Sequence, residues 1–188
     1  MTVTENTMIG MVKIPDNAQI QVTFTYTVGS DYNDYRSVLS IGSTVSERMP
    51  GVFISRYNKF VIYWNMDSES GTGKKTPSSR VEWGKKYSFH FYTSADRMTL
   101  NIKEGADDGD QIFSAFETGQ QHKLGTLQPI YVGNNFLQPD GGVLENLIIR
   151  EFKGNFNWWE NPIILTGSER GEAWVLPLVF WKFKNRDH

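Results

Sequence analysis

Hydrophobic and polar residues alternate along much of the chain with a period of two residues. Between Ile20 and Val28 every second residue is apolar, and the residues between them are Gln21 and three threonines. The same pattern recurs over Tyr87–Thr93 and Met98–Lys103. Successive side chains of a strand point to opposite faces, so this pattern predicts antiparallel strands with one face in a core. The other face of each strand is expected to meet solvent or a ligand.

Turn-forming residues separate these runs and set the number of strands. Val52–Tyr57 and Lys59–Trp64 are predicted strands that meet near Asn58, a residue type that tolerates left-handed backbone angles. Asp67–Ser79 has no large apolar residue and is predicted to be a long polar loop, whereas Pro139–Gly142 is predicted to be a turn. Strands at this spacing, about ten to twelve in all, predict an all-β fold, a two-sheet antiparallel jelly-roll sandwich.

The composition excludes several classes of protein. Of 188 residues, 39% are hydrophobic and 14% aromatic, which is too apolar for a disordered chain. The net charge is −2, so we expect no nucleic-acid partner, because such proteins carry a basic surface. The chain has no cysteine, and therefore no disulfide or thiolate nucleophile. We find no apolar run long enough to cross a membrane, and therefore expect no membrane insertion. Met1–Gly10 has no basic region followed by an apolar run, so we expect a signal peptide to be absent or already removed.

Several motifs occur in an order that resembles one known superfamily. They are a strand ending in glycine, a hairpin, a tryptophan that opens a central strand, a strand ending at a turn glycine, and a closing hairpin: Ser37–Gly42, Gly51–Trp64, Trp83–Phe89, Leu100–Gly105, and Ile130–Gly133 with Gly142–Ile149. This order is similar to that of the concanavalin A-like lectin/glucanase superfamily, above all its laminin G-like domains. The resemblance runs from about Ile20 to Lys153 and implies a jelly-roll fold, but that fold hosts lectins, adhesion modules, hydrolases and lyases.

The C-terminal segment departs from this resemblance. Asn155–His188 lies beyond the usual last strand and holds four of the six tryptophans. We therefore predict a concanavalin A-like β-sandwich over residues 1–154 and an aromatic C-terminal extension over residues 155–188. The extension is expected to pack on the sandwich or on a partner, and a homo-oligomer held through this tail is one expectation.

Catalytic motifs of the superfamily are incomplete in this chain. Glycanases need two carboxylates flanking the scissile bond, and related enzymes place them on one strand as Glu-x-Asp-x-x-Glu. The nearest match, Asn65–Ser70, has Asn in place of the first Glu and lacks the last. Gln120–His122 matches the Gln-x-His element of alginate lyase-type relatives, but the partner motifs are not recognisable. We therefore expect no enzyme, and keep a divergent hydrolase or lyase acting through Asp67, Glu69 or His122 as an alternative.

Aromatic and amide side chains suit a sugar-binding surface, because rings contact the apolar face of a pyranose and amides bind its hydroxyls. Two groups are candidates: an outward row on paired strands, and a set of loop residues that the topology is expected to gather at one rim. The first group is His90, Tyr92 and Asn101, and the second is Tyr32, Tyr35, Asn134, Asn135 and Phe136. Two alternatives stay open, namely that the tail covers the first group and that Asn134 and Asn135 only form a turn. Trp64 and Trp83 are expected to pack in the core or at a strand edge.

Acidic loops raise the question of a metal ion. Calcium prefers oxygen ligands from carboxylates and carbonyls, and some laminin G-like domains bind it at the ends of loops. The candidate ligands are Asp107, Asp108 and Asp110, with Asp31 and Asp34 as further candidates. Solvated turns are the alternative for all of them. No other cofactor is expected.

Together these features favour a non-catalytic carbohydrate-binding or receptor-binding module, of a phage tail or another adhesive assembly. Its expected partner is a glycan or a cell-surface receptor, and its expected location is extracellular or on a virion. A structural domain for protein–protein assembly is the first alternative, and a divergent glycan hydrolase or lyase is the second.

Overall fold

The chain folds as strands throughout the part that the structure describes. The computed structural model describes residues 1–3, 7–13, 19–29, 34–42, 48–64, 66–67, 73–94, 97–106, 108–118, 120–121, 127–133 and 137–152. All regular elements in these ranges are strands, which confirms the predicted all-β class. Within the same ranges there is no helix with the length and hydrophobicity needed to cross a membrane. The predicted extension over residues 155–188 lies outside the described residues.

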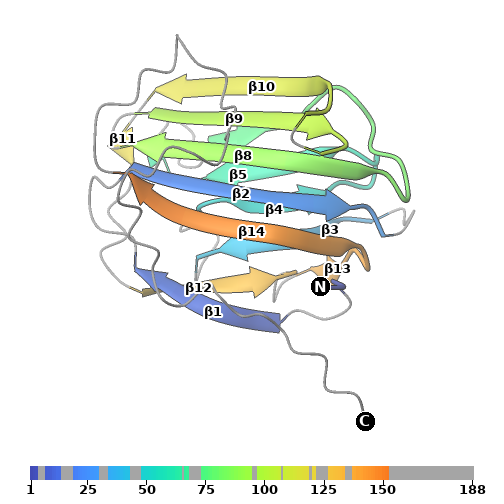
Figure 1. Ribbon diagram of the computed structural model, residues 1–188, viewed down its shortest axis with the longest axis horizontal. Coiled ribbons are helices and arrows are strands. Elements are labelled where there is room, and N and C mark those ends of the chain that lie inside the picture. Colours follow the sequence, from blue (N-terminus) through green and yellow to red (C-terminus); the bar gives the residue numbers. More distant parts are fainter. Residues whose placement is uncertain are drawn as a thin grey trace.

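Five antiparallel strands form what we call the smaller sheet. Its order is β10 (Gln111–Thr118), β9 (Arg97–Glu104), β8 (Lys86–Ser94), β2 (Gln19–Thr27) and β14 (Val143–Phe152). Figure 1 looks onto the outer face of this sheet. The expected strands over Ile20–Val28, Tyr87–Thr93 and Met98–Lys103 are thus confirmed as neighbours in one sheet.

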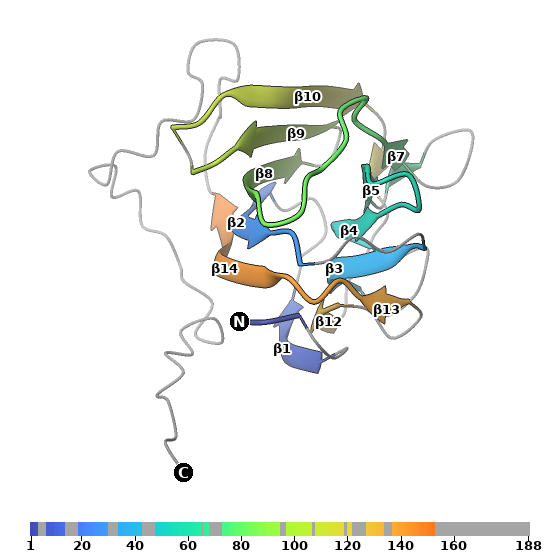
Figure 2. The ribbon, with the colours of Figure 1, turned by 90° about the vertical axis from the view of Figure 1, so that its right-hand side faces the viewer.

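Seven strands form what we call the larger sheet, which packs face to face on the smaller one (Figure 2). Its order is β1 (Thr7–Lys13), β12 (Leu127–Val132), β3 (Arg36–Ile41), β4 (Gly51–Ile54), β5 (Phe60–Trp64) and β7 (Gly73–Lys75), with β13 (Gln138–Pro139) parallel to β3. A third, two-stranded sheet pairs β6 (Met66–Asp67) with β11 (Gln120–Gln121). The predicted two-sheet antiparallel sandwich is confirmed.

The structure corrects two details of the predicted strands. The described residues contain fourteen strands rather than ten to twelve, because β6, β11 and β13 have two residues each. The prediction of a strand-free loop over Asp67–Ser79 is wrong, since β7 lies inside it and pairs with β5. Gly and Lys have low strand propensity, so the neighbouring strand decides this element, and lysines are common on such edges.

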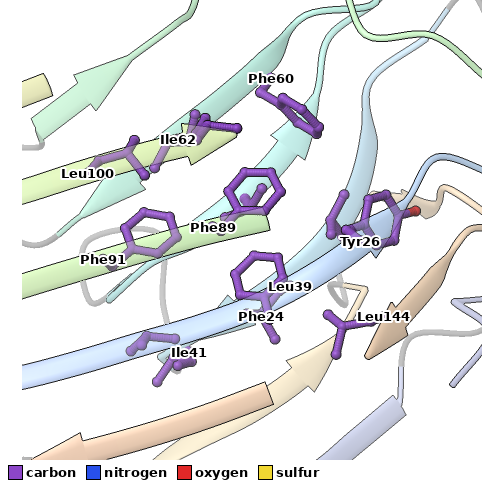
Figure 3. Packing of buried hydrophobic residues seen from close by; sticks show 14 of the residues in the cluster. Phe24, Tyr26, Leu39, Ile41, Phe60, Ile62, Phe89, Phe91, Leu100 and Leu144 are labelled. Atoms are coloured by element: carbon purple, nitrogen blue, oxygen red, sulfur yellow. The ribbon is translucent and has the colours of Figure 1, made fainter. Parts of the chain in front are cut away.

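Aromatic rings from both sheets meet in the core (Figure 3). Phe24 of β2 and Phe89 of β8 stack at a centroid distance of 4.6 Å, and their strands place them directly opposite one another. Phe60 of β5 meets Phe89 edge-on at 4.9 Å and so joins the larger sheet to the smaller one. Full burial of each such side chain contributes about 1.5–3 kcal/mol, so this contact between sheets is a main source of stability.

A buried polar network closes one end of the sandwich around Asp140, which is fully buried. Arg36 Nη1 lies 3.1 Å from Asp140 Oδ1, and the backbone nitrogen of Gly29 donates to Oδ2 at 2.7 Å. The hydroxyl of Tyr26 also donates to Oδ2. Burial, followed by the neighbouring Asp140, raises the pKa of Tyr26 above its usual value, so this phenol stays protonated. Arg36 also donates to Asn58 Oδ1 at 2.7 Å, which links the network to the turn between β4 and β5.

The predicted turn over Pro139–Gly142 therefore contains a residue, Asp140, that also connects the two sheets. Tyr26 belongs to the smaller sheet and Arg36 to the larger sheet, so one carboxylate ties both together. Asn58 adopts the left-handed conformation expected of it, with φ of 54°.

Candidate functional site

The predicted outward row lies on the smaller sheet, on the face opposite the core. His90 of β8 pairs in register with Asn101 of β9, and Tyr92 follows two residues along β8. The structure thus brings the three residues together. However, His90 is 6% exposed and Tyr92 is 2% exposed, whereas Asn101 is half-buried. The Tyr92 hydroxyl donates to Gln19 Oε1 at 2.5 Å. The prediction that this row binds a glycan stays a prediction, and it requires this face to open.

The burial extends across the outer face of the smaller sheet. The neighbouring outward side chains are polar and also buried: Gln21, Thr23, Thr25, Ser88 and Thr99. At one end of the same face, Lys86 Nζ lies 2.7 Å from Glu145 Oε2. This ion pair lowers the pKa of the Glu145 carboxyl. The centre of this face, along β2 and β8, is therefore polar and buried, whereas Phe116 of β10, which pairs with Thr99, is 45% exposed.

The structure tests little of the predicted rim and metal ligands. Six of the candidates lie outside the described residues: Tyr32, Asn134, Asn135 and Phe136 of the rim, and Asp31 and Asp107 of the metal ligands. Tyr35 is half-buried just before β3. Asp34, Asp108 and Asp110 are exposed, and Asp34 Oδ1 accepts a hydrogen bond from the Tyr35 backbone nitrogen at 2.7 Å. In the described ranges no three acidic or histidine side chains form a group able to hold a metal ion. The rim cluster and the calcium site both stay predictions.

The two partial catalytic motifs prove to be neighbours in space. Gln120 pairs in register with Asp67, and Gln121 pairs with Met66, in the two-stranded sheet. Glu69 and His122 lie outside the described residues. Sequence reasoning considered these motifs separately, because a pairing between positions so far apart leaves no local signal.

A second candidate site, which the sequence did not reveal, lies on the outer face of the larger sheet. Phe53 of β4 and Tyr63 of β5 face away from the core, because their strand neighbours Val52 and Ile62 belong to it. Lys74 of β7 pairs in register with Tyr63. We call Arg48, Phe53, Tyr63 and Lys74 the aromatic–cation cluster.

The cations of this cluster rest on its rings. Arg48 Cζ lies 4.7 Å from the centroid of the Phe53 ring and 5.0 Å from that of Tyr63. Lys74 Nζ lies 5.6 Å from the Tyr63 centroid. The two rings meet edge to face at 5.7 Å. Such contacts contribute about 0.5–2 kcal/mol each, and more where water is excluded.

Arg48 is 8% exposed, and its Nε has no hydrogen-bond partner among the residues that the structure describes. Burial lowers the pKa of its guanidinium, because the charged form loses hydration. Tyr63 is half-buried and Lys74 is exposed, so the cluster reaches the surface at β5 and β7.

Gly51 makes room for this arrangement. A Cβ atom at Gly51 would lie 2.8 Å from Arg48 Cδ and 3.0 Å from Phe53 Cε2, closer than ordinary packing allows. The arginine side chain therefore crosses β4 over the residue that has no side chain. The alternation within Phe60–Trp64 could have placed Tyr63 outward. No sequence pattern could have placed Arg48 over it.

The two sheets differ in the charges of their strands. The strands of the larger sheet contain no Asp or Glu, whereas those of the smaller sheet contain Glu104, Glu117, Glu145 and Glu151. Lys85, which immediately precedes β8, forms an ion pair with Glu104 at 2.7 Å. By contrast, Arg48 and Lys74 form no ion pair with any described carboxylate.

Two large aromatic side chains are exposed near one end of the sandwich. Trp83 is 75% exposed, which corrects the prediction that it packs in the core or at a strand edge; Trp64, 3% exposed, is confirmed in the core. Trp83 lies in a turn closed by a hydrogen bond from Lys85 to Glu82, which holds it off both sheets. Tyr57, at the turn between β4 and β5, is 58% exposed.

The arrangement of the two sheets identifies the class of fold. Two antiparallel sheets with this topology form a concanavalin A-like jelly roll, the fold that the motif order suggested. No protein-family model matches the sequence, and no curated protein sequence matches it either.

Solved structures share this fold at low sequence identity. The enzymatically active domain of tailspike protein 2 from bacteriophage CBA120 aligns with a TM-score of 0.53 and 12% identity, over 76% of this chain and 23% of that one. The full-length tailspike protein 2 from Escherichia coli O157:H7 bacteriophage CAB120 aligns with a TM-score of 0.54 and 10% identity, over 76% of this chain and 21% of that one. The LG1-3 region of the laminin alpha2 chain aligns with a TM-score of 0.50 and 12% identity, over 74% of this chain and 29% of that one. This chain therefore spans less than a third of each of these proteins.

Proposed function

We propose that the chain is a non-catalytic carbohydrate-binding or receptor-binding module, and that its ligand contacts the aromatic–cation cluster. The observation that carries the proposal is the position of Tyr63 on the outer face of the larger sheet. Its half-buried ring lies between a cation from the β4 side, Arg48, and one from the β7 side, Lys74. Sugars are recognised by aromatic surface combined with a few well-placed donors, and this cluster offers both.

The proposed binding site differs from the predicted row of His90, Tyr92 and Asn101, because it lies on the opposite face of the sandwich. His90 and Tyr92 are buried. Arg48 and Phe53 are buried as well, but Tyr63 is half-buried and Lys74 is exposed, so a ligand meets the cluster first at these two residues. The exposed rings of Tyr57 and Trp83 are further candidate contacts for a longer glycan. An adhesive assembly, such as a phage tail, is the setting that we propose for such a module.

Non-catalytic binding is supported by the incomplete motifs in the sequence. One neighbour is described as an enzymatically active domain, but this chain covers 23% of it and is 12% identical, so only the fold carries over. Asp67 and Gln120 pair through their backbones, which keeps a divergent hydrolase or lyase as the alternative. Turnover of a polysaccharide by the intact chain, abolished by Asp67→Asn, would establish that alternative.

A glycan array followed by calorimetry tests the proposal. Tyr63→Ala should weaken binding by about tenfold or more, because the ring anchors both cations. Tyr131→Ala is the matched control, since Tyr131 lies on β12 of the same sheet, three strands away. Asn101→Ala tests the predicted row in the same assay and should leave binding unchanged. Loss of binding in Asn101→Ala but not in Tyr63→Ala would return the site to the smaller sheet, and an array without binding would contradict the function itself.

A further inference from the structure

We infer that the aromatic–cation cluster selects acidic sugars: Arg48 binds the carboxylate of a uronic acid-type residue, and Lys74, on the other side of the Tyr63 ring, adds a second positive charge for the anionic chain. This inference rests on the proposed function and adds the chemical class of the ligand. It is carried by a buried cation whose charge no part of the described structure neutralises.

Arg48 is unusual because it is a buried charge to which no described residue supplies a counterion. A buried charge is costly unless it is paired and hydrogen-bonded. Arg36 follows this rule, since its guanidinium meets the carboxylate of Asp140 and the amide of Asn58. Arg48 is 8% exposed, and the rings of Phe53 and Tyr63 are its described contacts, with no acceptor for its Nε.

Rings and carboxylates engage different parts of a guanidinium. Aromatic rings contact its flat faces, whereas its N–H groups lie in the plane and point outward from the edge. The contacts with Phe53 and Tyr63 therefore hold Arg48 in place but give its N–H groups no oxygen acceptor. A carboxylate accepts two such N–H groups in parallel, and this is the strongest type of hydrogen bond that an arginine makes.

Lys74 supplies a second positive charge beside the same ring, 5.6 Å from the centroid of Tyr63. It is exposed and forms no ion pair with a described residue, so it is available to a ligand. The larger sheet has no Asp or Glu in its strands that could compete for either cation. The charge of this face thus favours an anionic ligand, and the ring of Tyr63 favours a sugar as its carrier.

Calorimetry with matched ligands tests the inference on the full chain. The probes are a panel of oligouronates, each beside its methyl ester, which keeps the sugar but removes the charge. We expect at least one oligouronate to bind, and its ester to bind about tenfold more weakly or worse, because charge-assisted hydrogen bonds are lost. Equal binding of acid and ester would overturn the inference and leave the proposed function standing. No binding to any neutral or acidic glycan would contradict both. Equal binding of a sulfated neutral oligosaccharide would overturn the selection of a carboxylate.

Variants separate the role of the cations from stability. Lys74→Gln changes an exposed side chain, so the protein should fold normally and bind the oligouronate about three- to tenfold more weakly, with the ester unaffected. Lys86→Gln is the matched control, because it removes the same charge from the smaller sheet and should not alter binding. Arg48→Lys keeps the charge but loses the planar fork, and should bind more weakly than the wild type. An unchanged affinity in both Lys74→Gln and Arg48→Lys would overturn the inference.

Discussion

The two outer faces of this sandwich are built from the same alternating strands, yet they present opposite chemistry. On the smaller sheet the outward residues at the centre of β2 and β8 are polar and buried, with Tyr92 2% exposed, and at the end of this face Lys86 is paired with Glu145. On the larger sheet the outward face over β4, β5 and β7 carries the aromatic–cation cluster, with Arg48 and Lys74 resting on rings. The alternation of apolar and polar residues shows which side chains point away from the core. The contacts that these side chains make decide whether they are buried and hydrogen-bonded or available for a ligand.

The largest effect is expected at the point where the two sheets share a buried charge. Asp140→Ala should lower the free energy of unfolding by about 3–5 kcal/mol, because the buried Arg36 loses the carboxylate that neutralises its charge. Urea denaturation measures this loss. Asp108→Ala, at an exposed turn, is the control and should change stability by less than about 0.5 kcal/mol. A loss below about 1 kcal/mol at Asp140 would contradict its role as the tie between the sheets.

A smaller loss of stability is expected at Gly51, where the missing side chain leaves room for Arg48. Gly51→Ala should cost about 1–3 kcal/mol and weaken glycan binding, because the added methyl group displaces Arg48 and crowds Phe53. Thermal unfolding and calorimetry measure the two effects. Gly10→Ala on β1 of the same sheet is the control, since its Cβ would meet nothing within 4 Å. If both variants bind equally well, the position of Arg48 does not matter for the ligand.

Removing residues 155–188 tests whether the C-terminal extension affects the outer face of the smaller sheet but not that of the larger sheet. We predict that this aromatic segment packs on the sandwich or on a partner, so its loss should change the oligomeric state or expose Tyr92. Affinity for the glycan should stay within about twofold, because the aromatic–cation cluster lies on the other sheet. Light scattering reports the oligomeric state, and chemical labelling of tyrosines located by mass spectrometry reports the exposure of Tyr92. A large loss of affinity in a folded truncated chain would place the ligand near the extension instead.

The smallest effect is expected for the ion pair on the smaller sheet. Lys86 lowers the pKa of Glu145 in the folded state, so the pair stabilises the protein above the ordinary pKa of a glutamate. That stability is lost as the pH falls through the lowered folded-state pKa. Glu145→Gln should remove this acid dependence and cost at most about 0.5 kcal/mol at neutral pH, since the pair is exposed to water. Urea denaturation at several pH values measures it, and a larger cost would mean that the pair is shielded from solvent.

Much of the fold was predictable because a strand with one buried face shows an apolar residue at every second position of the sequence. The strands around Phe24, Phe89 and Ile102 were recognised from alternation alone, and they occupy neighbouring positions in one sheet. β7 was missed because its strand state comes from pairing with β5. Trp83 was misplaced because a turn, rather than its hydrophobicity, decides its exposure.

The sequence by itself determined the division between inside and outside, because an apolar residue at every second position can be buried on one face only. It also determined the lack of Asp and Glu in the strands that became the larger sheet. The tertiary structure decided which outward residues met, because contacts between distant segments depend on how strands and turns pack. Through that packing Asp140 reached Arg36, and Arg48 came to lie over Tyr63.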